Sequence, residues 1–307
     1  GIDLGPLAER ARALVVRSSA SLVNPAMREV ICANGEVVPY DVLSIDVGSR
    51  AYTGRVEGVE AHAVVIRPLE RFVEGWEKLL ARARLGAMSS VSVVGGGAAG
   101  LELAFAVEER LRRESGGQAP HVRVLTDART VVPEYPAAAR GRLLRLARRR
   151  NIGTHGGSPV TEVGPGYLRL RDAIEFATDA TLWVAGAAAP GLIRDSGLQA
   201  DDRGFLAVND FMQSLSHPEV FGAGDCATNI ANPRPKAGVF AVRAGPVLAA
   251  NLVAALKGGP LERYVPSPRY LALVSCGARY AVGVYGGLSF EGGWAWRWKD
   301  RIDRRFL

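Results

Sequence analysis

Three glycines at a fixed spacing, Gly95, Gly97 and Gly100, give the sequence its clearest chemical signal. The pattern G-x-G-x-x-G lies where an apolar run gives way to the helical sequence LELAFAVEERL. In such a loop the first glycine permits a tight turn, the second lets backbone approach a pyrophosphate, and the third allows close helix packing. The helix would offer its free amides and the positive end of its dipole to phosphate oxygens. A dinucleotide is therefore the predicted ligand.

The sequence on both sides of this loop supplies the elements that would hold it in place. Val91, Val93 and Val94 predict a buried strand, and HVRVL at residues 121–125 predicts a second strand. The apolar helix between them completes a β-α-β unit. A lone glycine pattern is weak evidence, but its position between a strand and a helix favours a dinucleotide site over a structural turn.

A second glycine-rich turn follows further along the chain. The segment VFGAGDCA at residues 220–227 places Gly222, Gly224 and Asp225 after another apolar strand. A long apolar helix is expected from about residue 238 to residue 256. Because one nucleotide site rarely needs two such turns, the sequence predicts two nucleotide ligands.

Shorter patterns predict the remaining elements. Short strands are indicated in the first 50 residues, among them residues 13–16, and Asn34-Gly35 between two apolar runs predicts a hairpin. Helical spacing of apolar side chains predicts a helix at residues 69–85 with Trp76 in the core. The last 50 residues alternate like antiparallel strands.

The composition describes a globular protein with room for two or three domains. The 307 residues are 48% hydrophobic and contain no low-complexity tract, which excludes a disordered chain. The net charge of +7 is scattered apart from an arginine-rich run at residues 143–151, whose leucines and arginines fall on opposite faces of a helix. Since no recognition motif accompanies this charge, we expect no nucleic-acid partner.

The three cysteines, Cys32, Cys226 and Cys276, are too few and too far apart for a disulfide framework, a C-x-x-C redox pair or a metal site. A reducing, cytoplasmic setting fits this usage. The sequence shows no run of about 18 apolar residues and no charged-then-apolar leader. We therefore expect neither a membrane-spanning helix nor a signal peptide.

Four motifs occur along the chain in a fixed order. They are YDVLSIDVGS at residues 40–49, VSVVGGGAAGLELA at 91–104, TLWVAGAAAP at 181–190 and SHPEVFGAGDCA at 216–227. In this order they resemble the pyridine nucleotide-disulfide oxidoreductase superfamily, whose members bind FAD and NAD(P) in two dinucleotide domains. The segment NPRPKAGVFAVRAGPVLAANL and the ending WRWKDRIDRRF more narrowly resemble type II NADH:quinone and sulfide:quinone oxidoreductases, and the oxidoreductases joined to selenide, water dikinase.

The resemblance covers essentially the whole chain and implies its fold. An α/β protein is expected, with two Rossmann-like, three-layer domains, the NAD(P) domain inserted in the FAD domain, and a small C-terminal α+β region. Residues 1–84 would be the remainder of the first FAD-domain segment and a connector, 85–190 the NAD(P)-binding domain, 191–258 the second FAD-domain segment, and 259–307 a C-terminal interface or tail region.

One feature of the superfamily is missing. Its members begin with a strand and a glycine loop for the FAD pyrophosphate, and no such loop precedes Val91. The chain is either a fragment of a FAD enzyme or a protein that holds FAD poorly. A fragment with an N-terminally truncated FAD domain is the favoured interpretation, because all later flavin motifs remain recognisable.

Seven residues match positions that contact FAD. By the resemblance, Asp225 accepts a hydrogen bond from the ribityl chain; the alternative is an ordinary turn carboxylate. The helix beginning near Gly238 would aim its amides at the pyrimidine edge of the flavin, and Lys236 would either add to that field or remain solvated. The full set is Gly48, Gly222, Gly224, Asp225, Lys236, Ala237 and Gly238.

A second set matches positions that contact NAD(P). Glu102 could orient the nicotinamide amide, or it could interact with its own helix end. The acidic residue that usually binds the adenosine ribose corresponds to Thr126 or Asp127, and Arg129 follows shortly after in the sequence. An acid there favours NADH whereas an arginine accepts a 2′-phosphate, so the preference stays open. The full set is Gly95, Gly97, Gly100, Glu102, Thr126, Asp127 and Gly186.

The tail alternates aromatic and basic residues. Trp294, Trp296 and Trp298 could lie at the inner face of a membrane, with indoles at the headgroup level and neighbouring cations on anionic lipid. The same alternation is typical of a strand with one buried face. A final strand and helix that pack the tryptophans on the domain are the favoured interpretation, and peripheral membrane contact is the alternative.

The sequence therefore predicts a FAD-dependent NAD(P)H oxidoreductase that passes hydride from nicotinamide to flavin and electrons to an acceptor such as a quinone. One alternative is a non-catalytic nucleotide-binding module without FAD. Another is a sulfide:quinone-type enzyme, which would need two reactive cysteines, whereas Cys226 and Cys276 are expected to be structural. The resemblance also implies a fused or associated selenide, water dikinase as a partner.

Overall fold

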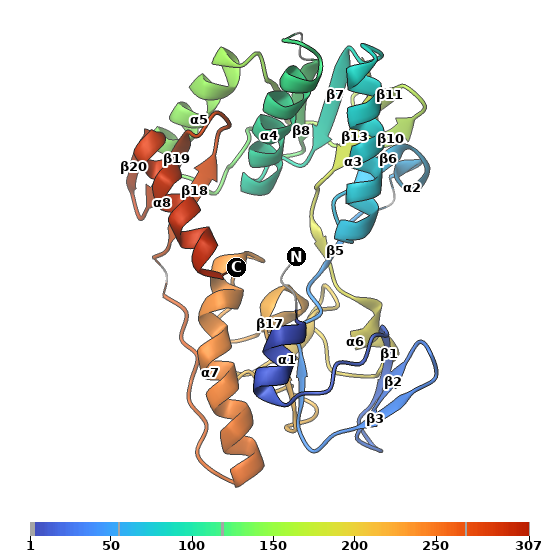
Figure 1. Ribbon diagram of the computed structural model, residues 1–307, viewed down its shortest axis with the longest axis vertical. Coiled ribbons are helices and arrows are strands. Elements are labelled where there is room, and N and C mark those ends of the chain that lie inside the picture. The colour runs from blue at the N-terminus through green and yellow to red at the C-terminus, as the bar shows by residue number, and fades with distance from the viewer. Residues whose placement is uncertain (1–3, 55, 118–119, 268, 307) are drawn as a thin grey trace. The chain divides into compact units, whose positions relative to one another are not determined.

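Contacts between residues divide the protein into two compact units. The computed structural model describes residues 4–54, 56–117, 120–267 and 269–306 (Figure 1). The first unit takes in Gly1–Arg50 and Ala187–Pro268, and the second takes in Ala51–Gly186 and Arg269–Phe306. The chain passes from the first unit to the second within β5 (Arg50–Ala51) and returns to the first unit directly before β14 (Ala187–Ala188).

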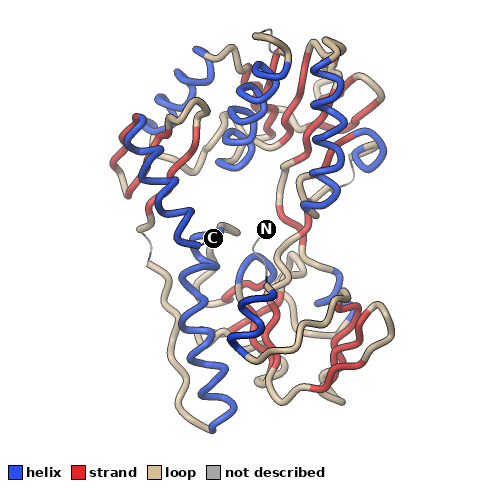
Figure 2. Tube along the Cα trace, in the orientation of Figure 1, coloured by secondary structure: helices blue, strands red, loops and turns tan. Residues whose placement is uncertain are grey.

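A parallel sheet of five strands forms the centre of the second unit (Figure 2). Its strands in spatial order are β6 (Ala63–Val65), β13 (Ala180–Trp183), β7 (Ser90–Val94), β8 (His121–Thr126) and β9 (Gly153–Gly156). Every residue of β7 is buried, as a parallel sheet covered on both faces requires. The predicted β-α-β unit is confirmed, because α4 (Ala98–Glu114) connects β7 to β8.

The two faces of this sheet are covered differently, which gives three layers. One face packs its valines against α3 (Leu69–Arg84), α4 and α5 (Ala137–Arg149), and Trp76 borders that core. The other face packs Val94, Leu125 and Trp183 against α2 (Val59–His62) and an antiparallel sheet. That sheet consists of β10 (Val160–Gly164), β11 (Tyr167–Leu170) and β12 (Glu175–Ala177). The predicted α/β class with a Rossmann-like sheet is confirmed.

The C-terminal part of the chain belongs to this second unit. The strands β18 (Leu271–Ser275), β19 (Ala281–Tyr285) and β20 (Leu288–Gly292) form an antiparallel sheet, followed by α8 (Gly293–Asp303) and a short turn of helix, η2 (Arg304–Phe306). Val274 and Val282 join the same core as α4 and α5. Residues 51–84 also lie here rather than with the first segment, because β6 pairs with β13. The observed passages therefore differ from the boundaries predicted at residues 84 and 259.

The first unit contains smaller sheets. An antiparallel sheet of β1 (Ala20–Asn24), β2 (Glu29–Cys32) and β3 (Val37–Pro39) includes the predicted hairpin, where Gly35 has φ +84°. Parallel pairs join β4 (Leu43–Ile45) to β16 (Val220–Gly222) and β15 (Leu206–Val208) to β17 (Ala227–Asn229). The helices are α1 (Gly5–Ala11), α6 (Gly191–Asp195), η1 (Gly224–Cys226) and α7 (Gly238–Lys257).

The strand predicted at residues 13–16 is wrong. These residues follow α1 as irregular chain, and Leu14 is 87% exposed. A short apolar run forms a strand only where a partner strand and a core receive it, and here neither is present among the described residues.

Helix α7 meets the length and composition of a membrane-spanning helix, although the sequence contains no run of about 18 apolar residues. Its 20 residues are long and apolar enough by length and composition, and 17% of its most apolar stretch is buried. Arg243 and Asn251 interrupt its apolar residues, which is why the sequence shows no continuous apolar run of that length. Phe240, Ala244 and the hydrogen-bonded Asn251 are buried in the first unit.

A buried charge network ties the C-terminal sheet to α4. The guanidinium of Arg150 bonds to Glu109, lies 3.2 Å from the carboxylate of Glu108, and donates 3.3 Å to the carbonyl oxygen of Cys276. Burial raises the pKa of Glu109, but hydrogen bonds from Arg150 and Arg113 outweigh it and lower that pKa to about 2. Burial raises the pKa of Glu108 despite the neighbouring Arg150 and Arg112.

We expect Arg150→Met to lower the free energy of unfolding by about 2 kcal/mol, because Glu108 and Glu109 lose one of the two guanidinium groups that contact both of them, and only Arg112 remains in that position. The stabilisation from Glu109 is present above about pH 4.5 and is lost as the pH falls towards 2, so the variant should show a flatter acid dependence. Urea unfolding at several pH values measures both effects. Arg110→Met is the control, since Arg110 pairs with Glu114 at the surface and its loss should cost less than about 1 kcal/mol. Equal losses in the two variants would contradict the prediction.

Candidate functional site

A cavity of about 480 Å³ opens around the glycine loop of the second unit. It lies at the carboxyl ends of β7, β8 and β13, where parallel α/β sheets bind their ligands. Its volume is within the range of about 300–1,000 Å³ that encloses small-molecule ligands. Six of the residues predicted to contact NAD(P) line it: Gly95, Gly97, Gly100, Thr126, Asp127 and Gly186.

Glycine suits each of the three positions of the loop for a different structural reason. Gly95 has φ +127°, and a Cβ there would lie 2.9 Å from the backbone nitrogen of Ala185. A Cβ on Gly100 would lie 1.8 Å from the carbonyl oxygen of Gly95, so only glycine lets α4 approach the loop. A Cβ on Gly97 would meet open space, at the start of a helix with no side-chain cap. Free amides beside open space fit the pyrophosphate of NAD(P).

Several residues that line this cavity were missed by sequence reasoning. Tyr52 and Trp183 meet at its wall, where the indole nitrogen donates 2.8 Å to the carbonyl oxygen of Tyr52. Glu134 lines it from the loop after β8. Trp183 stands at the end of a predicted strand, which is a usable signal, whereas nothing local marks Tyr52 or Glu134.

Glu102 lies outside the residues that line the cavity. Its Oε1 atom accepts a hydrogen bond of 3.0 Å from the backbone nitrogen of Ser275, and the amine of Lys299 lies 3.5 Å away. Burial raises the pKa of Glu102 against the opposing effect of Lys299. Ser275 is 173 positions away in the sequence, so neither role considered for Glu102 included these partners.

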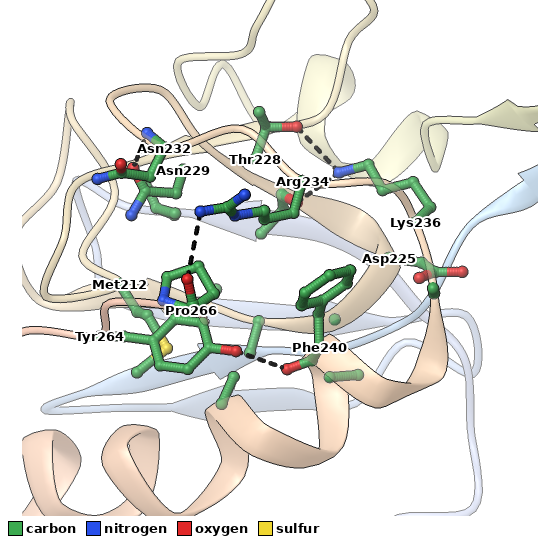
Figure 3. A pocket seen from close by; sticks show the side chains of 18 of the residues that line it. Met212, Asp225, Thr228, Asn229, Asn232, Arg234, Lys236, Phe240, Tyr264 and Pro266 are labelled. Atoms are coloured by element: carbon green, nitrogen blue, oxygen red, sulfur yellow. Dashed lines mark hydrogen bonds between the residues drawn. The ribbon is translucent and has the colours of Figure 1, made fainter. Parts of the chain in front are cut away.

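A smaller cavity of about 70 Å³ lies in the first unit, beside the turn that precedes η1 and the start of α7 (Figure 3). Five of the predicted FAD residues line it: Gly222, Gly224, Asp225, Lys236 and Ala237. Gly48 and Gly238 do not line it, although Gly238 is the first residue of α7 and a Cβ there would meet open space. The small volume and the donor set fit one portion of FAD, the ribityl chain and one ring edge.

Close packing of backbone against Asp46 determines the turn at Asp225. Gly224 has φ +67°, and a Cβ there would lie 2.1 Å from Oδ1 of Asp46. Burial and the charge of Asp225 raise the pKa of Asp46. Ser49 donates a hydrogen bond of 3.4 Å to Asp225, so the motifs at residues 40–49 and 216–227 meet at this turn.

Lys236 is held in place rather than freely solvated. Its amine donates to the carbonyl oxygen of Ala227 and, over 2.9 Å, to the hydroxyl of Thr228. It also lies 4.1 Å from the ring centroid of Phe205. Desolvation lowers its pKa, although Asp201 and Asp225 oppose the shift. The chain therefore keeps a fixed amine at the edge of this cavity.

Cys226 and Cys276 lie in surroundings that disfavour a reactive thiolate. Cys226 and Cys276 are both buried and unpaired, and the two thiols lie in different units. Burial raises the pKa of Cys226 to about 11 and that of Cys276 to about 12. Because the thiolate is the reactive form, neither group is a nucleophile near neutral pH.

Comparison with known proteins agrees with this geometry. The family model described as pyridine nucleotide-disulphide oxidoreductase matches residues 9–245. The chain belongs to this family. The members most relevant to the site include the internal alternative NAD(P)H-ubiquinone oxidoreductase A1 of Arabidopsis thaliana, 24% identical over 62% of this chain and 40% of that protein. The type II NADH:quinone oxidoreductase of Haemophilus influenzae is 23% identical over 74% of this chain and 58% of its own length.

Two solved structures share the fold. The sulfide:quinone oxidoreductase of Aquifex aeolicus has a TM-score of 0.82 and 19% identity, and covers 100% of this chain and 77% of that one. NDH2 of Plasmodium falciparum, solved with NADH, has a TM-score of 0.82 and 13% identity, over 95% and 80% of the two chains. The two-dinucleotide-domain architecture is thus confirmed. The chain spans 40% and 58% of the two curated relatives named above.

We expect Gly97→Ala to weaken NADH binding by about tenfold or more without lowering the melting temperature, because the added methyl group enters open cavity space and meets no protein atom. Gly100→Ala is the matched comparison. Its methyl group would collide with the carbonyl oxygen of Gly95, so this variant should lose stability as well as binding. Calorimetric titration with NADH and thermal unfolding separate the two effects, and unchanged affinity in Gly97→Ala would argue against a pyrophosphate at this loop.

Proposed function

We propose that this chain is a FAD-dependent NAD(P)H oxidoreductase whose electron acceptor is a quinone. The observation that carries the proposal is the presence of two cofactor cradles in one chain, the glycine-loop cavity and the turn at Asp225 with the start of α7. The relatives named as NAD(P)H-ubiquinone and NADH:quinone oxidoreductases support the choice of acceptor. When bound, FAD supplies the group that accepts hydride from nicotinamide.

The residues of the chain contribute binding and electrostatics. The amides at the start of α4 hold the pyrophosphate of the nicotinamide cofactor, and Gly97 leaves room for it. Asp225 accepts a hydrogen bond from the ribityl chain. The uncapped amides of α7 and the fixed amine of Lys236 favour negative charge on the flavin edge that faces them, which promotes its reduction.

The lining of the larger cavity favours NADH over NADPH. Asp127 lines it at the end of β8, where a carboxylate can bind the ribose hydroxyls and repel a 2′-phosphate. Arg129, two residues further on, is not among the residues that line this cavity. We therefore infer that NADH is the physiological donor.

Helix α8 offers a surface for peripheral membrane contact on the inner face of the membrane. The tail forms a final strand, β20, followed by α8, which carries the tryptophans. Trp294 and Trp298 are four residues apart on this helix and stack with Phe290. These two indoles are 50% and 42% exposed. Trp296 lies elsewhere, with the guanidinium of Arg279 over its ring at 5.8 Å. Contact of this surface with a membrane would bring the protein close to a quinone dissolved in the lipid.

The resemblance to oxidoreductases joined to selenide, water dikinase adds a partner to the proposal. A fused or associated kinase of that type would place this chain in an assembly.

The proposed activity is tested by NADH oxidation with added FAD and a soluble quinone. We expect the protein to turn yellow with FAD, to oxidise NADH faster with quinone than with oxygen alone, and to prefer NADH. Asp127→Ala should reduce the preference for NADH over NADPH by about tenfold, whereas Arg129→Ala should leave it unchanged. A colourless protein that ignores FAD yet binds NADH would favour the non-catalytic nucleotide-binding module.

We expect the protein to sediment with vesicles that contain anionic phospholipid. The double substitution of Trp294 and Trp298 by alanine should weaken this binding by about tenfold, because it removes the exposed indoles. Trp296→Ala is the control, since its ring is engaged by Arg279. Equal binding by the double variant and the unaltered protein would eliminate α8 as the contact surface.

A further inference from the structure

A second cation, Arg234, lines the small cavity of the first unit and has no role so far. It lies on the loop between β17 and α7, and Figure 3 shows its guanidinium reaching across the cavity towards Pro266. Its Nη2 atom donates 3.2 Å to the carbonyl oxygen of Pro266. Its Nε atom is buried and has no partner among the described residues. A buried donor left unpaired is costly, so this N–H is a candidate to bind a ligand.

The loop that carries Arg234 is fixed by a set of polar contacts. Asp210 accepts hydrogen bonds of 3.1 Å from Asn229 and 3.0 Å from Asn232, at the beginning of this loop. The buried Asn251 of α7 donates to the carbonyl oxygen of Glu262 and accepts from its backbone nitrogen. These bonds fix the segment after α7 beside the cavity, and the carbonyl oxygen of Pro266 in this segment accepts the hydrogen bond from Arg234. The guanidinium is therefore positioned before any ligand arrives.

The charges around this cavity favour a ligand with negative character. Arg234, Lys236 and the start of α7 all contribute positive potential, and Asp225 is the single acid among the lining residues. Two donor directions of Lys236 are already occupied by Ala227 and Thr228. A lysine ammonium has three N–H donors, so one remains on Lys236, and the buried Nε–H of Arg234 is the second donor left without a partner among the described residues.

Size and the remaining walls restrict the ligand further. A volume of about 70 Å³ is well below that of pockets which enclose a whole small molecule, so it admits only an edge of a ring. Phe240, Met212, Tyr264 and Pro266 supply flat or apolar walls. The hydroxyl of Tyr264 is occupied, because it donates 3.0 Å to the carbonyl oxygen of Phe240.

We propose that Arg234 donates a hydrogen bond from Nε to a carbonyl or ionised oxygen on the edge of a planar, reducible ring. This inference rests on the proposed function, which supplies two sources of such an oxygen, the pyrimidine edge of the flavin and the quinone acceptor. Arg234 is a positioning and charge-stabilising residue for either one. Since a carbonyl oxygen gains negative charge when its ring is reduced, a guanidinium partner favours the reduced form.

The test compares ligand affinities rather than turnover. Riboflavin serves as the flavin probe, 2-hydroxy-1,4-naphthoquinone as an ionised quinone, and menadione as a quinone without that oxygen, each titrated calorimetrically into the full chain. We expect Arg234→Met to weaken the binding of riboflavin or of the ionised quinone by about tenfold to a hundredfold. The affinity for menadione should change least. Arg234→Lys should restore part of the affinity. Arg243→Met, which removes an exposed charge of α7 outside the cavity, should leave all three affinities unchanged.

The possible outcomes distinguish the flavin from the quinone as the ligand of Arg234, and the Arg234 inference from the proposed function. Loss of riboflavin binding alone assigns Arg234 to the flavin edge, and loss of naphthoquinone binding alone assigns it to the acceptor. Unchanged affinities in an Arg234→Met protein that melts like the unaltered one overturn the inference, as does a failure of the unaltered protein to bind any probe. NADH binding and quinone-dependent NADH oxidation on the same samples report on the proposed function, so its failure alone leaves the Arg234 contact standing.

Discussion

The contact between Gly100 and the carbonyl oxygen of Gly95 is the constraint on which the second unit depends. A single methyl group at Gly100 would fall 1.8 Å from that oxygen, so the helix can begin this close to its strand only without a side chain there. This closeness lets α4 pack Leu101, Ala104 and Phe105 into the core behind the central sheet. It also directs the free amides of α4 into the cavity at the carboxyl ends of the strands. Core packing and ligand binding thus depend on the same short contact.

The C-terminal sheet extends this unit through charge as well as apolar packing. Arg150 lies beyond α5 and reaches both Glu108 and Glu109 of α4 while it bonds to the backbone beside Cys276. On the same helix, Glu102 binds the backbone of Ser275 and the amine of Lys299. Three carboxylates of one helix therefore fix a sheet and a helix that come from the far end of the chain. This explains why residues 271–303 belong to the second unit.

The sequence predicted those features whose signal is local. The glycine spacing at 95–100, the hairpin at Asn34-Gly35 and the apolar spacing of α3 all follow from the conformations of a few neighbouring residues. The tail contains the expected final strand and helix, β20 and α8. The alternating tryptophans that suggested a strand lie on the helix, whose turn brings Trp294 beside Trp298. The partners of Glu102 and Arg234 could not be predicted, since Ser275 and Pro266 reach them only through tertiary packing.

The electrostatics of the described residues favour one class of acceptor chemistry over another. Sulfur chemistry needs a thiolate, yet burial raises the pKa values of Cys226 and Cys276 far above neutrality. Oxygen chemistry at a ring edge needs fixed positive charge, and the first unit places Arg234, Lys236 and the start of α7 around one small cavity. A guanidinium cannot lose its proton near neutral pH, so this potential persists when electrons arrive. The first unit therefore offers fixed positive charge to an oxygen that gains electrons, as the proposed reduction of a conjugated carbonyl requires.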